Sequence, residues 1–277
     1  MKLNEHTAVS SARLFLVPYD AHHVPTYHEW MADPAIQEAT ASEPLTLEEE
    51  YENQVSWRTS GDKLTFILCL RGTPGEDNNN VAKGEAARAG QVDTPEKMIG
   101  DINLFLTPWD EDEVDETETG ETSTAPSSSS SSYVNGEIDI MIASAAHRRL
   151  GLGREAVSTL LSYIRRHVEE ILGEYAAFTS SDSDSTNAIP APTAGQRGVQ
   201  QQQQRKQKFV LRDLVAKINA GNEGSIALFK SLGFRQKGEV NYFGELLLVL
   251  DDFYKLREDK ESESEVYGEL VWDRTGL

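Results

Sequence analysis

The sequence predicts a mixed α/β sheet with helices on both of its faces. Strand and helix patterns alternate along most of the chain, a strand–turn–helix segment with two glycines lies near its middle, and a hairpin pattern follows. The 277 residues are enough for one substantial core or two small ones. We expect a single domain over 1–254, followed by a charged tail over 255–277.

Local patterns predict each element in chain order. Apolar or alternating runs predict strands at 13–17, 64–70, 98–106, 137–143 and 209–218. Helical patterns occur at 24–31, 46–57, 154–171 and 224–232. In the second of these helices, Thr46 is the expected N-cap and Glu49 completes a capping box. The segments 235–242 and 245–250 predict a final hairpin around Gly244.

Three polar stretches interrupt this pattern, at about 72–96, 109–135 and 176–208. The first is rich in Asn, Gly and Ala, the second joins an acidic run to six serines, and the third ends in five glutamines. Segments of this composition bury too little apolar surface to become ordered. Because polar loops tolerate added length at a small entropic cost, we expect disordered insertions at all three places.

Composition excludes several classes of function. The net charge of −20, from 46 acidic against 26 basic residues, argues against a basic surface for nucleic acid. No apolar run approaches membrane-spanning length and the N-terminus has no signal-peptide pattern, so we expect no membrane partner and a cytoplasmic or nuclear location. Cys69 is the only cysteine, which excludes a disulfide or a thiolate zinc site within the chain, and we expect no metal.

The segment from Glu137 to Val168 has the strongest functional signal. A strand ends, a turn with Gly151 and Gly153 follows, and a helix begins whose first amides have no partner within the helix. These amides and the helix dipole form a site for an anion such as phosphate, which glycines allow to approach the backbone closely. Positive charge around the turn comes from Arg148, Arg149 and Arg154.

Three kinds of phosphate site compete for this turn. A P-loop requires Gly-Lys-Ser/Thr, which the turn lacks. A dinucleotide site fits the string Gly151-x-Gly153-x-x-Ala156, but the acid expected about twenty residues later should end a second strand, and that region continues as helix. The third kind is the pyrophosphate site of coenzyme A.

Two motifs resemble those of a known family. Arg148-x-x-Gly151-x-Gly153 resembles the Gln/Arg-x-x-Gly-x-Gly/Ala motif of the GNAT superfamily of N-acetyltransferases, and the segment 222–234 resembles the superfamily's Asn-x-x-Ser/Ala … aromatic … Gly-Phe motif. Outside the insertions, residues 1–250 also resemble the N-acetyltransferase-9-like group, for example at Ala41–Glu48 and Gly100–Leu106. The resemblance implies a GNAT fold, acetyl-CoA as co-substrate, and acetylation of the N-terminal amine of a protein such as tubulin.

The resemblance also implies which residues bind acetyl-CoA. Backbone groups of Met141, Ile142 and Ala143 are expected to bind the pantetheine arm, as an added strand would. The pyrophosphate is expected at Arg148, Arg149, Leu150, Gly151, Leu152, Gly153 and Arg154. Asn222 and Phe229 are expected beside the pantetheine and its thiol. Many family members have tyrosine in place of Phe229, where it protonates the departing thiolate, and phenylalanine cannot donate a proton.

Glu137 and Asp139 are the candidates for the catalytic base, directly or through a water. They share one face of their predicted strand, next to the expected cofactor site. The alternative is that they face solvent or pair with lysine. His22 and His23 are expected as a surface pair rather than as a base.

The nature of the acceptor depends on which amine is neutral at pH 7. With a pKa near 7.8, about one α-amine in seven is neutral, against about one lysine in 2,500 at a pKa near 10.4. An N-terminal amine therefore requires less help from a base. The alternatives are acetylation of lysine or a polyamine, or a catalytically weak, acetyl-CoA-binding scaffold on microtubules, which the missing phenol at Phe229 would favour.

Overall fold

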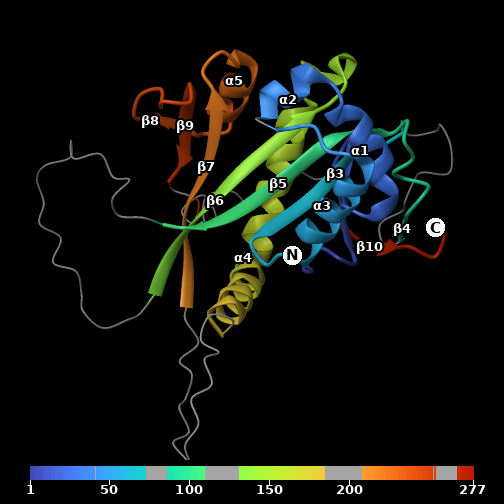
Figure 1. Ribbon diagram of the computed structural model, residues 1–277, viewed down its shortest axis with the longest axis horizontal. Helices are drawn as coiled ribbons and strands as arrows, with labels where there is room; N and C mark the ends of the chain where they lie inside the picture. Colours follow the sequence, from blue (N-terminus) through green and yellow to red (C-terminus); the bar gives the residue numbers. More distant parts are fainter. Residues whose placement is uncertain (41, 73–85, 110–130, 185–207, 252, 254–266) are drawn as a thin grey trace, which may run out of the picture.

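The computed structural model describes residues 1–40, 42–72, 86–109, 131–184, 208–251, 253 and 267–277. These residues form a strongly twisted sheet with helices on both faces (Figure 1). Much of the three expected insertions and of the expected tail lies outside the described residues. The mixed α/β sheet that the sequence predicts is confirmed.

The sheet has ten strands within the described residues, in the order β4-β10-β1-β2-β3-β5-β6-β7-β9-β8. Two neighbouring pairs are parallel, β6 with β7 and β4 with β10, and the others are antiparallel. The strands span Thr7–Ser10 (β1), Leu14–Pro18 (β2), Lys63–Leu70 (β3), Ala87–Arg88 (β4), Met98–Pro108 (β5), Ser131–Ile142 (β6), Lys208–Asn219 (β7), Arg235–Lys237 (β8), Glu245–Leu250 (β9) and Gly268–Asp273 (β10).

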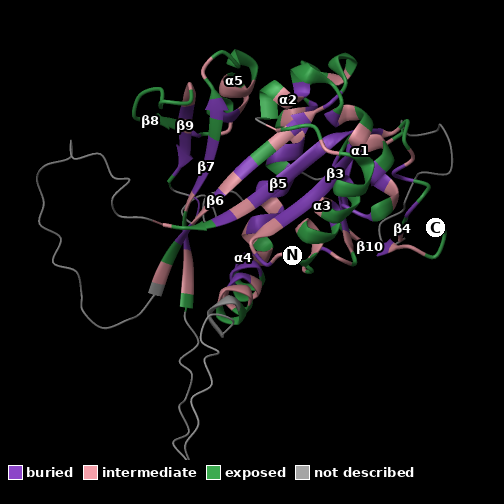
Figure 2. Cartoon of the chain, in the orientation of Figure 1, coloured by how far each residue is buried: buried purple, intermediate pink, exposed green. Residues whose placement is uncertain are grey.

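The helices divide between the two faces of the sheet (Figure 1). They are η1 (Ala21–His23), α1 (Val24–Met31), α2 (Pro34–Thr40), α3 (Leu47–Thr59), η3 (Ala145–His147), α4 (Leu152–Asp184) and α5 (Glu223–Ser231). One core joins α4 and α5 to the sheet, and a second core joins α1 and α2 to the opposite face. Figure 2 shows that the central strands β3 and β5 are buried along most of their length. No helix in the described part of the chain has the length and apolar character to cross a membrane.

The expected local structure is confirmed in most places. Thr46 caps α3 as predicted, since Glu49 donates its N–H to Thr46 Oγ1 over 3.3 Å and accepts the Thr46 N–H over 2.8 Å. Cys69 is buried in β3, which agrees with the apolar run around it. β1 and α2 were not predicted from the sequence, because each is too short to show a clear period.

The edges of the expected insertions require correction. Residues 131–135 belong to β6 and residues 176–184 extend α4, whereas both were expected in insertions. Residues 86–96 include β4 and a turn closed by the Asp93 carboxylate, which accepts the Gly90 N–H over 2.6 Å. The partners of β6 and β4 are strands distant in sequence, and 176–184 continue a helix that begins at Leu152, so the polar composition of these residues did not reveal where each insertion begins and ends.

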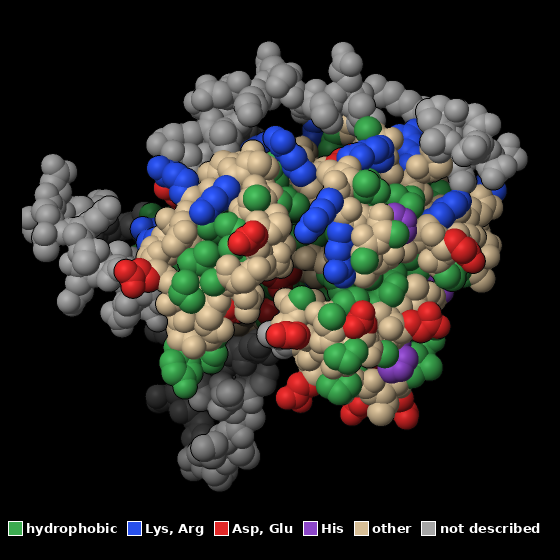
Figure 3. Space-filling model, turned by 90° about the horizontal axis from the view of Figure 1, so that it is seen from above, with side chains coloured by type: hydrophobic (Ala, Val, Ile, Leu, Met, Phe, Trp, Pro, Cys, Tyr) green, Lys and Arg blue, Asp and Glu red, His purple; other side chains and the backbone are tan. Residues whose placement is uncertain are grey.

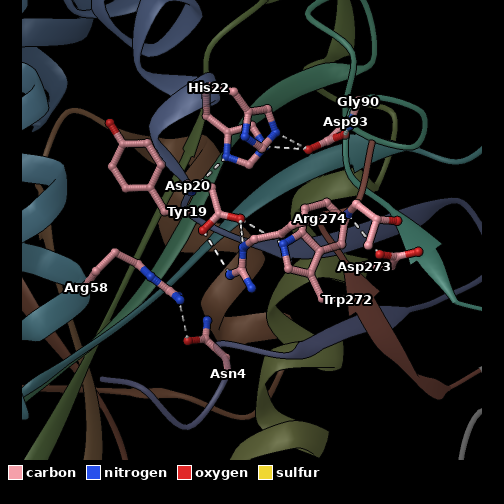
Figure 4. Close-up of polar contacts among 12 residues, drawn as sticks. Asn4, Tyr19, Asp20, His22, Arg58, Gly90, Asp93, Trp272, Asp273 and Arg274 are labelled. Atoms are coloured by element: carbon pink, nitrogen blue, oxygen red, sulfur yellow. Dashed lines mark hydrogen bonds and ion pairs between the residues drawn. The ribbon is translucent and has the colours of Figure 1, made fainter. Parts of the chain in front are cut away.

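The expected charged tail also requires correction, because its last part is a strand. β10 pairs antiparallel with β1, from Thr7↔Val271 to Ser10↔Gly268. Trp272 is 2% exposed, and its Nε1 donates to Asp20 Oδ2 over 2.8 Å. Arg274 donates to both oxygens of the same carboxylate, over 2.7 and 3.0 Å. Figure 4 shows this carboxylate between the two side chains. The partner of this strand lies about as far away in sequence as the chain permits.

Replacing Trp272 by alanine should cost about 3–5 kcal/mol of unfolding free energy, because a buried indole leaves a cavity and Asp20 loses a donor. Trp272→Phe keeps most of the packing and loses the N–H, so we expect a loss nearer 1 kcal/mol. Urea unfolding followed by circular dichroism measures both. Equal losses in the two variants would contradict the view that packing dominates at this position.

Candidate active site

A fork between β6 and β7 is the main opening in the sheet. The two strands pair in parallel from Ser131↔Lys208 as far as Glu137↔Val215, and the pairing ends there. Beyond that point β6 continues to Ile142 beside β5, and β7 continues to Asn219 beside β9. Figure 1 shows the two strands diverging toward the end where α5 lies. The inner edges of the fork therefore offer backbone groups to a ligand that binds as an added strand.

The glycine turn lies directly after the open end of β6. Arg149 has a φ of 62° and Gly151 a φ of 79°, and α4 begins at Leu152. Gly151 is needed because a side chain at such a φ is strained. At Gly153 a Cβ would lie 2.9 Å from Leu228 Cδ1 of α5 and 3.8 Å from Ile140 Cδ1 of β6, so the missing side chain lets the start of α4 pack closely against both. The first amides of α4, which have no partners within the helix, thus lie beside β6 and α5 and are available to an anion.

An ion pair fixes the turn from outside. Arg13 Nε lies 2.7 Å from Glu155 Oε2, and Arg13 NH1 donates to the Leu150 carbonyl over 2.8 Å. Glu155 Oε1 also accepts from the Ser11 hydroxyl over 2.8 Å and from the Arg13 N–H over 2.7 Å. Burial opposes ionisation of Glu155, but these donors outweigh it and lower its pKa. The sequence showed no sign of this pair, because its members are more than 140 residues apart.

The three arginines of the turn have different positions. Arg148 turns back onto the end of β6, where it donates to the Ile142 carbonyl over 2.9 Å and to the Ala143 carbonyl over 3.0 Å. Arg149 and Arg154 are exposed. Figure 3 shows a hollow between two lobes of the molecule, with lysine and arginine side chains along its rim and acidic side chains inside. This distribution of charge suits an anionic ligand at the rim and an amine inside.

The second motif, on α5, has a structural role in addition to its position near the fork. Asn222 caps α5 by accepting the Ser225 N–H at Oδ1 over 3.1 Å. Phe229 is 2% exposed and packs edge-on against Phe234, with ring centroids 5.0 Å apart. The structure thus gives Asn222 a capping role and Phe229 a core role, and the phenyl ring has no proton to donate.

The two predicted acids lie at the fork, on the face covered by α1. Glu137 is paired with Lys217 of β7, with 3.0 Å between Oε2 and Nζ. Asp139 lies two residues further into the open part and keeps contact with solvent. The surrounding protein and the negative charges of Glu137 and Asp101 raise the pKa of Asp139 to about 7, against the opposing effect of Lys217. A carboxylate with this pKa suits general-base catalysis near neutral pH.

Asp101 is a buried acid beside this site that sequence reasoning did not single out. It lies on β5, is 3% exposed, and accepts from Asn103 Nδ2 over 2.9 Å and from the Tyr27 hydroxyl over 3.4 Å. Burial raises its pKa to about 6. A polar residue at every second position of an otherwise apolar strand, Asp101 and then Asn103, was the available signal.

His22 and His23 form a cluster with Asp93 in which His23 and Asp93 are buried and His22 is half-buried, which corrects the expectation of a surface pair (Figure 4). Their Nε2 atoms lie 2.5 and 2.7 Å from Asp93 Oδ2, and His23 is fully buried. His23 Nδ1 accepts the Asp20 N–H over 3.0 Å, so the proton of a neutral ring lies on Nε2. The three residues are the one group among those described with spacing that suits a metal ion. In His23, however, the protonated Nε2 donates to the Asp93 carboxylate and has no lone pair for a metal.

Comparison with known proteins agrees with this geometry. A family model described as an acetyltransferase (GNAT) domain matches residues 13–235. The N-acetyltransferase 9-like protein of Schizosaccharomyces pombe is 34% identical over 253 residues, covering 90% of this chain and 98% of that protein. The human protein named alpha/beta-tubulin-N-acetyltransferase 9 is 34% identical over 252 residues, covering 90% of this chain and 86% of that protein. A Drosophila melanogaster protein of the same name is 37% identical over 183 residues, covering 66% of this chain and 75% of that protein.

The family match spans both the glycine turn and the second motif, and the relatives extend over nearly the whole chain. Both motifs lie at the fork in the structure, as the sequence resemblance requires. The chain belongs to the acetyltransferase (GNAT) family, and it is an N-acetyltransferase.

Proposed function

We propose that this protein transfers the acetyl group of acetyl-CoA to the N-terminal α-amine of a protein, by direct attack of the amine in a ternary complex. The observation that carries this proposal is Asp139, an acid with a pKa raised to about 7 in the open part of the fork. In this proposal its carboxylate takes the proton that the amine loses.

The strength of this base favours an α-amine over a lysine. The pKa of Asp139, raised to about 7, lies close to that of an α-ammonium, at about 7.8. It lies much further below that of a lysine ammonium, at about 10.4, so proton transfer from lysine to Asp139 is less favourable. Asp139 is thus matched to the first acceptor and poorly matched to the second.

The fork and the glycine turn fit acetyl-CoA, which supplies the acetyl thioester. The part of β6 and its extension beyond the β6–β7 pairing, with Met141, Ile142 and Ala143, suits the amide groups of the pantetheine arm, although Arg148 already donates to the Ile142 and Ala143 carbonyls. The start of α4, with Leu150, Gly151, Leu152, Gly153 and the exposed Arg149 and Arg154, suits the pyrophosphate. Arg148 supports this site by holding the end of β6. Asn222 and Phe229 border the fork from α5 and hold α5 in position. Asn222 does so by capping the helix, and Phe229 by packing against Phe234 in the core.

Glu155→Ala should weaken acetyl-CoA binding about tenfold, because the turn loses the carboxylate that joins Arg13 and Ser11 to α4. Isothermal titration with acetyl-CoA measures the change. Glu169→Ala provides the control, since Glu169 is an exposed acid further along the same helix. Equal affinity in wild type and Glu155→Ala would show that the turn keeps its shape without the ion pair.

Tubulin is the proposed acceptor protein because of the relatives. Two of them are named alpha/beta-tubulin-N-acetyltransferase 9, at 34–37% identity to this chain. Tubulin in the cytoplasm would be within reach of an enzyme located there. The acidic surface of this chain does not itself select tubulin, so the proposal depends on relatedness.

Acetyl transfer from labelled acetyl-CoA to a panel of acceptors tests the proposed function. The panel contains tubulin N-terminal peptides, the same peptides blocked at the α-amine, lysine peptides with blocked ends, and spermidine. We expect label on the free α-amine alone. Label on blocked peptides would contradict the α-amine proposal, and label on unrelated N-terminal peptides at equal rates would contradict tubulin as the preferred acceptor.

A small polyamine is the second candidate acceptor. Two observations favour it: acidic side chains lie inside the hollow (Figure 3), and Asp101, Glu137 and Glu245 add their negative charge to that of Asp139 at the fork. This negative charge would strengthen the binding of a compact cation with several amines. Preferential labelling of spermidine in the same panel would support this candidate over the peptide.

A further inference from the structure

A row of polar side chains crosses the face of the sheet beneath α1. Thr65 on β3 lies opposite Asn103 on β5, and Asn103 lies opposite Asp139 on β6. Directly opposed residues on neighbouring strands have Cβ atoms about 5 Å apart, within reach of a hydrogen bond between their side chains. Asp101 lies on the same face as Asn103, diagonal to Asp139. Buried polar residues in such a row require partners.

The amide of Asn103 has a fixed orientation. An ionised carboxylate only accepts hydrogen bonds, so the Nδ2 group must face Asp101, with which it makes a 2.9 Å bond. The Tyr27 hydroxyl donates to the same Asp101 oxygen and keeps the carboxylate in place. The Oδ1 atom of Asn103 is consequently directed away from Asp101. Asn103 is 4% exposed, and its Oδ1 has no hydrogen-bond partner among the described residues.

A buried acceptor without a donor costs about 1–3 kcal/mol, so its persistence calls for an explanation. Two groups lie opposite Asn103: Thr65 on β3, whose hydroxyl also makes no hydrogen bond among the described residues, and Asp139 on β6, which has no proton to donate while it is ionised. Once Asp139 has taken a proton, its carboxyl group becomes a donor. The orphan acceptor and the new donor would then face each other across the β5–β6 pair.

We propose that Asp101 and Asn103 are positioning residues for acetyl transfer: Asp101 orients the Asn103 amide so that Asn103 Oδ1 accepts a hydrogen bond from Asp139 after Asp139 has taken the proton of the acceptor amine. This inference depends on the proposed role of Asp139 as the base. It assigns a function to two residues outside both motifs of the family.

The proton and electrons balance in this step. The amine nitrogen forms a bond to the acetyl carbon, the carbon–sulfur bond breaks, and its electron pair leaves with the sulfur. The proton released from nitrogen passes to the Asp139 carboxylate. The resulting carboxyl donates it to Asn103 Oδ1 as a hydrogen bond, until Asp139, which keeps contact with solvent, releases the proton to water.

The charges that face Asp139 agree with such an arrangement. Glu137 on β6, Asp101 on β5 and Glu245 on β9 favour the protonated form of Asp139, and Lys217 on β7 opposes it. Three further titratable groups lie around Asp101: Tyr19, which directly follows β2, Tyr27 of α1 and Glu50 of α3. A hydrogen bond from protonated Asp139 to Asn103 would add to the charge effects and raise the pKa of Asp139 further.

The experiment measures the pKa of Asp139 in the full chain in two ways, with Asn103→Leu as the main variant. The first is the pH profile of kcat/KM with an N-terminal peptide, whose rise on the acid side (the acid limb) reports the pKa of the base. The second is carbon-13 NMR of the aspartate carboxyls, assigned by comparison with Asp139→Asn, which gives the pKa directly. We expect Asn103→Leu to move both about one unit lower, the size of one hydrogen bond. We also expect the plateau rate to fall about threefold, because the base is weaker.

Two further variants keep the proposal testable. Asn103→Ser shortens the side chain and should shift the limb in the same direction, which serves if the leucine variant does not fold. Thr65→Val is the matched control: it removes the hydroxyl on the other side of Asn103 and should leave the limb in place. Asp101→Asn should shift the limb at least as far as Asn103→Leu, since it loses both the amide orientation and a charge.

The outcomes separate this inference from the proposed function. A uniform loss of rate at every pH, with an unchanged Asp139 pKa by NMR, would assign Asn103 a structural role and overturn the inference. If Asp139→Asn keeps full activity, the proposed base is wrong, whatever the Asn103 variants do. If Asp139→Asn is inactive while Asn103→Leu and Asn103→Ser leave the limb unmoved, the base stands and the positioning role is overturned.

Discussion

Asp139→Asn should lower kcat/KM by about 10²- to 10⁴-fold, because asparagine has nearly the same shape as aspartate but cannot take a proton from the amine. Asp139 lies in the open part of the fork, two residues beyond the last β6–β7 pair, Glu137↔Val215. Steady-state kinetics with an N-terminal peptide and acetyl-CoA measure the loss. Acetyl-CoA binding should be unchanged, because Asp139 lies on the face of β6 covered by α1, away from the glycine turn.

The pH dependence of the wild-type enzyme provides a second measurement of the same group. The pKa of Asp139 is raised to about 7, and a base acts in its deprotonated form, so the rate should rise as the pH rises through about 7. The acceptor contributes its own rise near its α-amine pKa, at about 7.8. A peptide with a different α-amine pKa should move only the second rise.

Asp213→Asn is the control for the base. Asp213 also has a raised pKa caused by burial, but it lies on β7 before the fork, next to Arg212. We expect this variant to keep its activity and its pH profile. A loss of less than tenfold in Asp139→Asn would show that the proton leaves by another route, with water or Glu137 as the next candidates.

Gly100→Ala should have the largest effect on stability of any single methyl added to the described sheet. A Cβ at Gly100 would lie 1.8 Å from the Met141 carbonyl oxygen and 2.8 Å from its carbon. Those atoms belong to the backbone of β6, which cannot turn aside as a side chain can. The strands β5 and β6 would have to separate where Gly100 pairs with Ile142. We expect a loss of about 3 kcal/mol or more of unfolding free energy.

Thermal unfolding followed by circular dichroism tests this prediction, and a loss of that size corresponds to a Tm lower by roughly 6–12 °C. Gly173→Ala is the matched control, because a Cβ on this glycine of α4 meets nothing within 4 Å. Alanine also favours the helix over glycine by about 1 kcal/mol, so the control should be neutral or more stable. A Gly100→Ala protein as stable as wild type would mean that β5 and β6 can move apart at small cost.

Most of the fold followed from local patterns in the sequence. The alternation of apolar and acidic residues along 137–143 predicted that Glu137 and Asp139 share a face, and in the structure they do. The glycine turn predicted the start of a helix after a strand, which is confirmed at Leu152. These predictions succeeded because a period of two or of 3.6 residues, and a cap or glycine at its end, are local properties of the chain.

The unpredicted elements are those whose partners are distant in sequence. β10 follows a charged segment and is stabilised by β1 and by Asp20, more than 250 residues away. His23 is buried because Asp93 and the backbone of Asp20 provide its hydrogen bonds. Polar residues usually lie at the surface, so such partners cannot be inferred from composition.

The sequence by itself determined the kind of protein, through the glycine turn, the second motif and the alternating strand that ends in the turn. Only the tertiary structure decided how the site is assembled. It placed the end of the β6–β7 pairing at Glu137, set Asp101 and Asn103 beside Asp139, and joined Arg13 to Glu155 behind the turn. The physical reason is that a pKa and a hydrogen bond depend on which groups lie within a few ångströms, and around Asp101 and Asp139 those groups come from β5, β6, β7, β9 and α1.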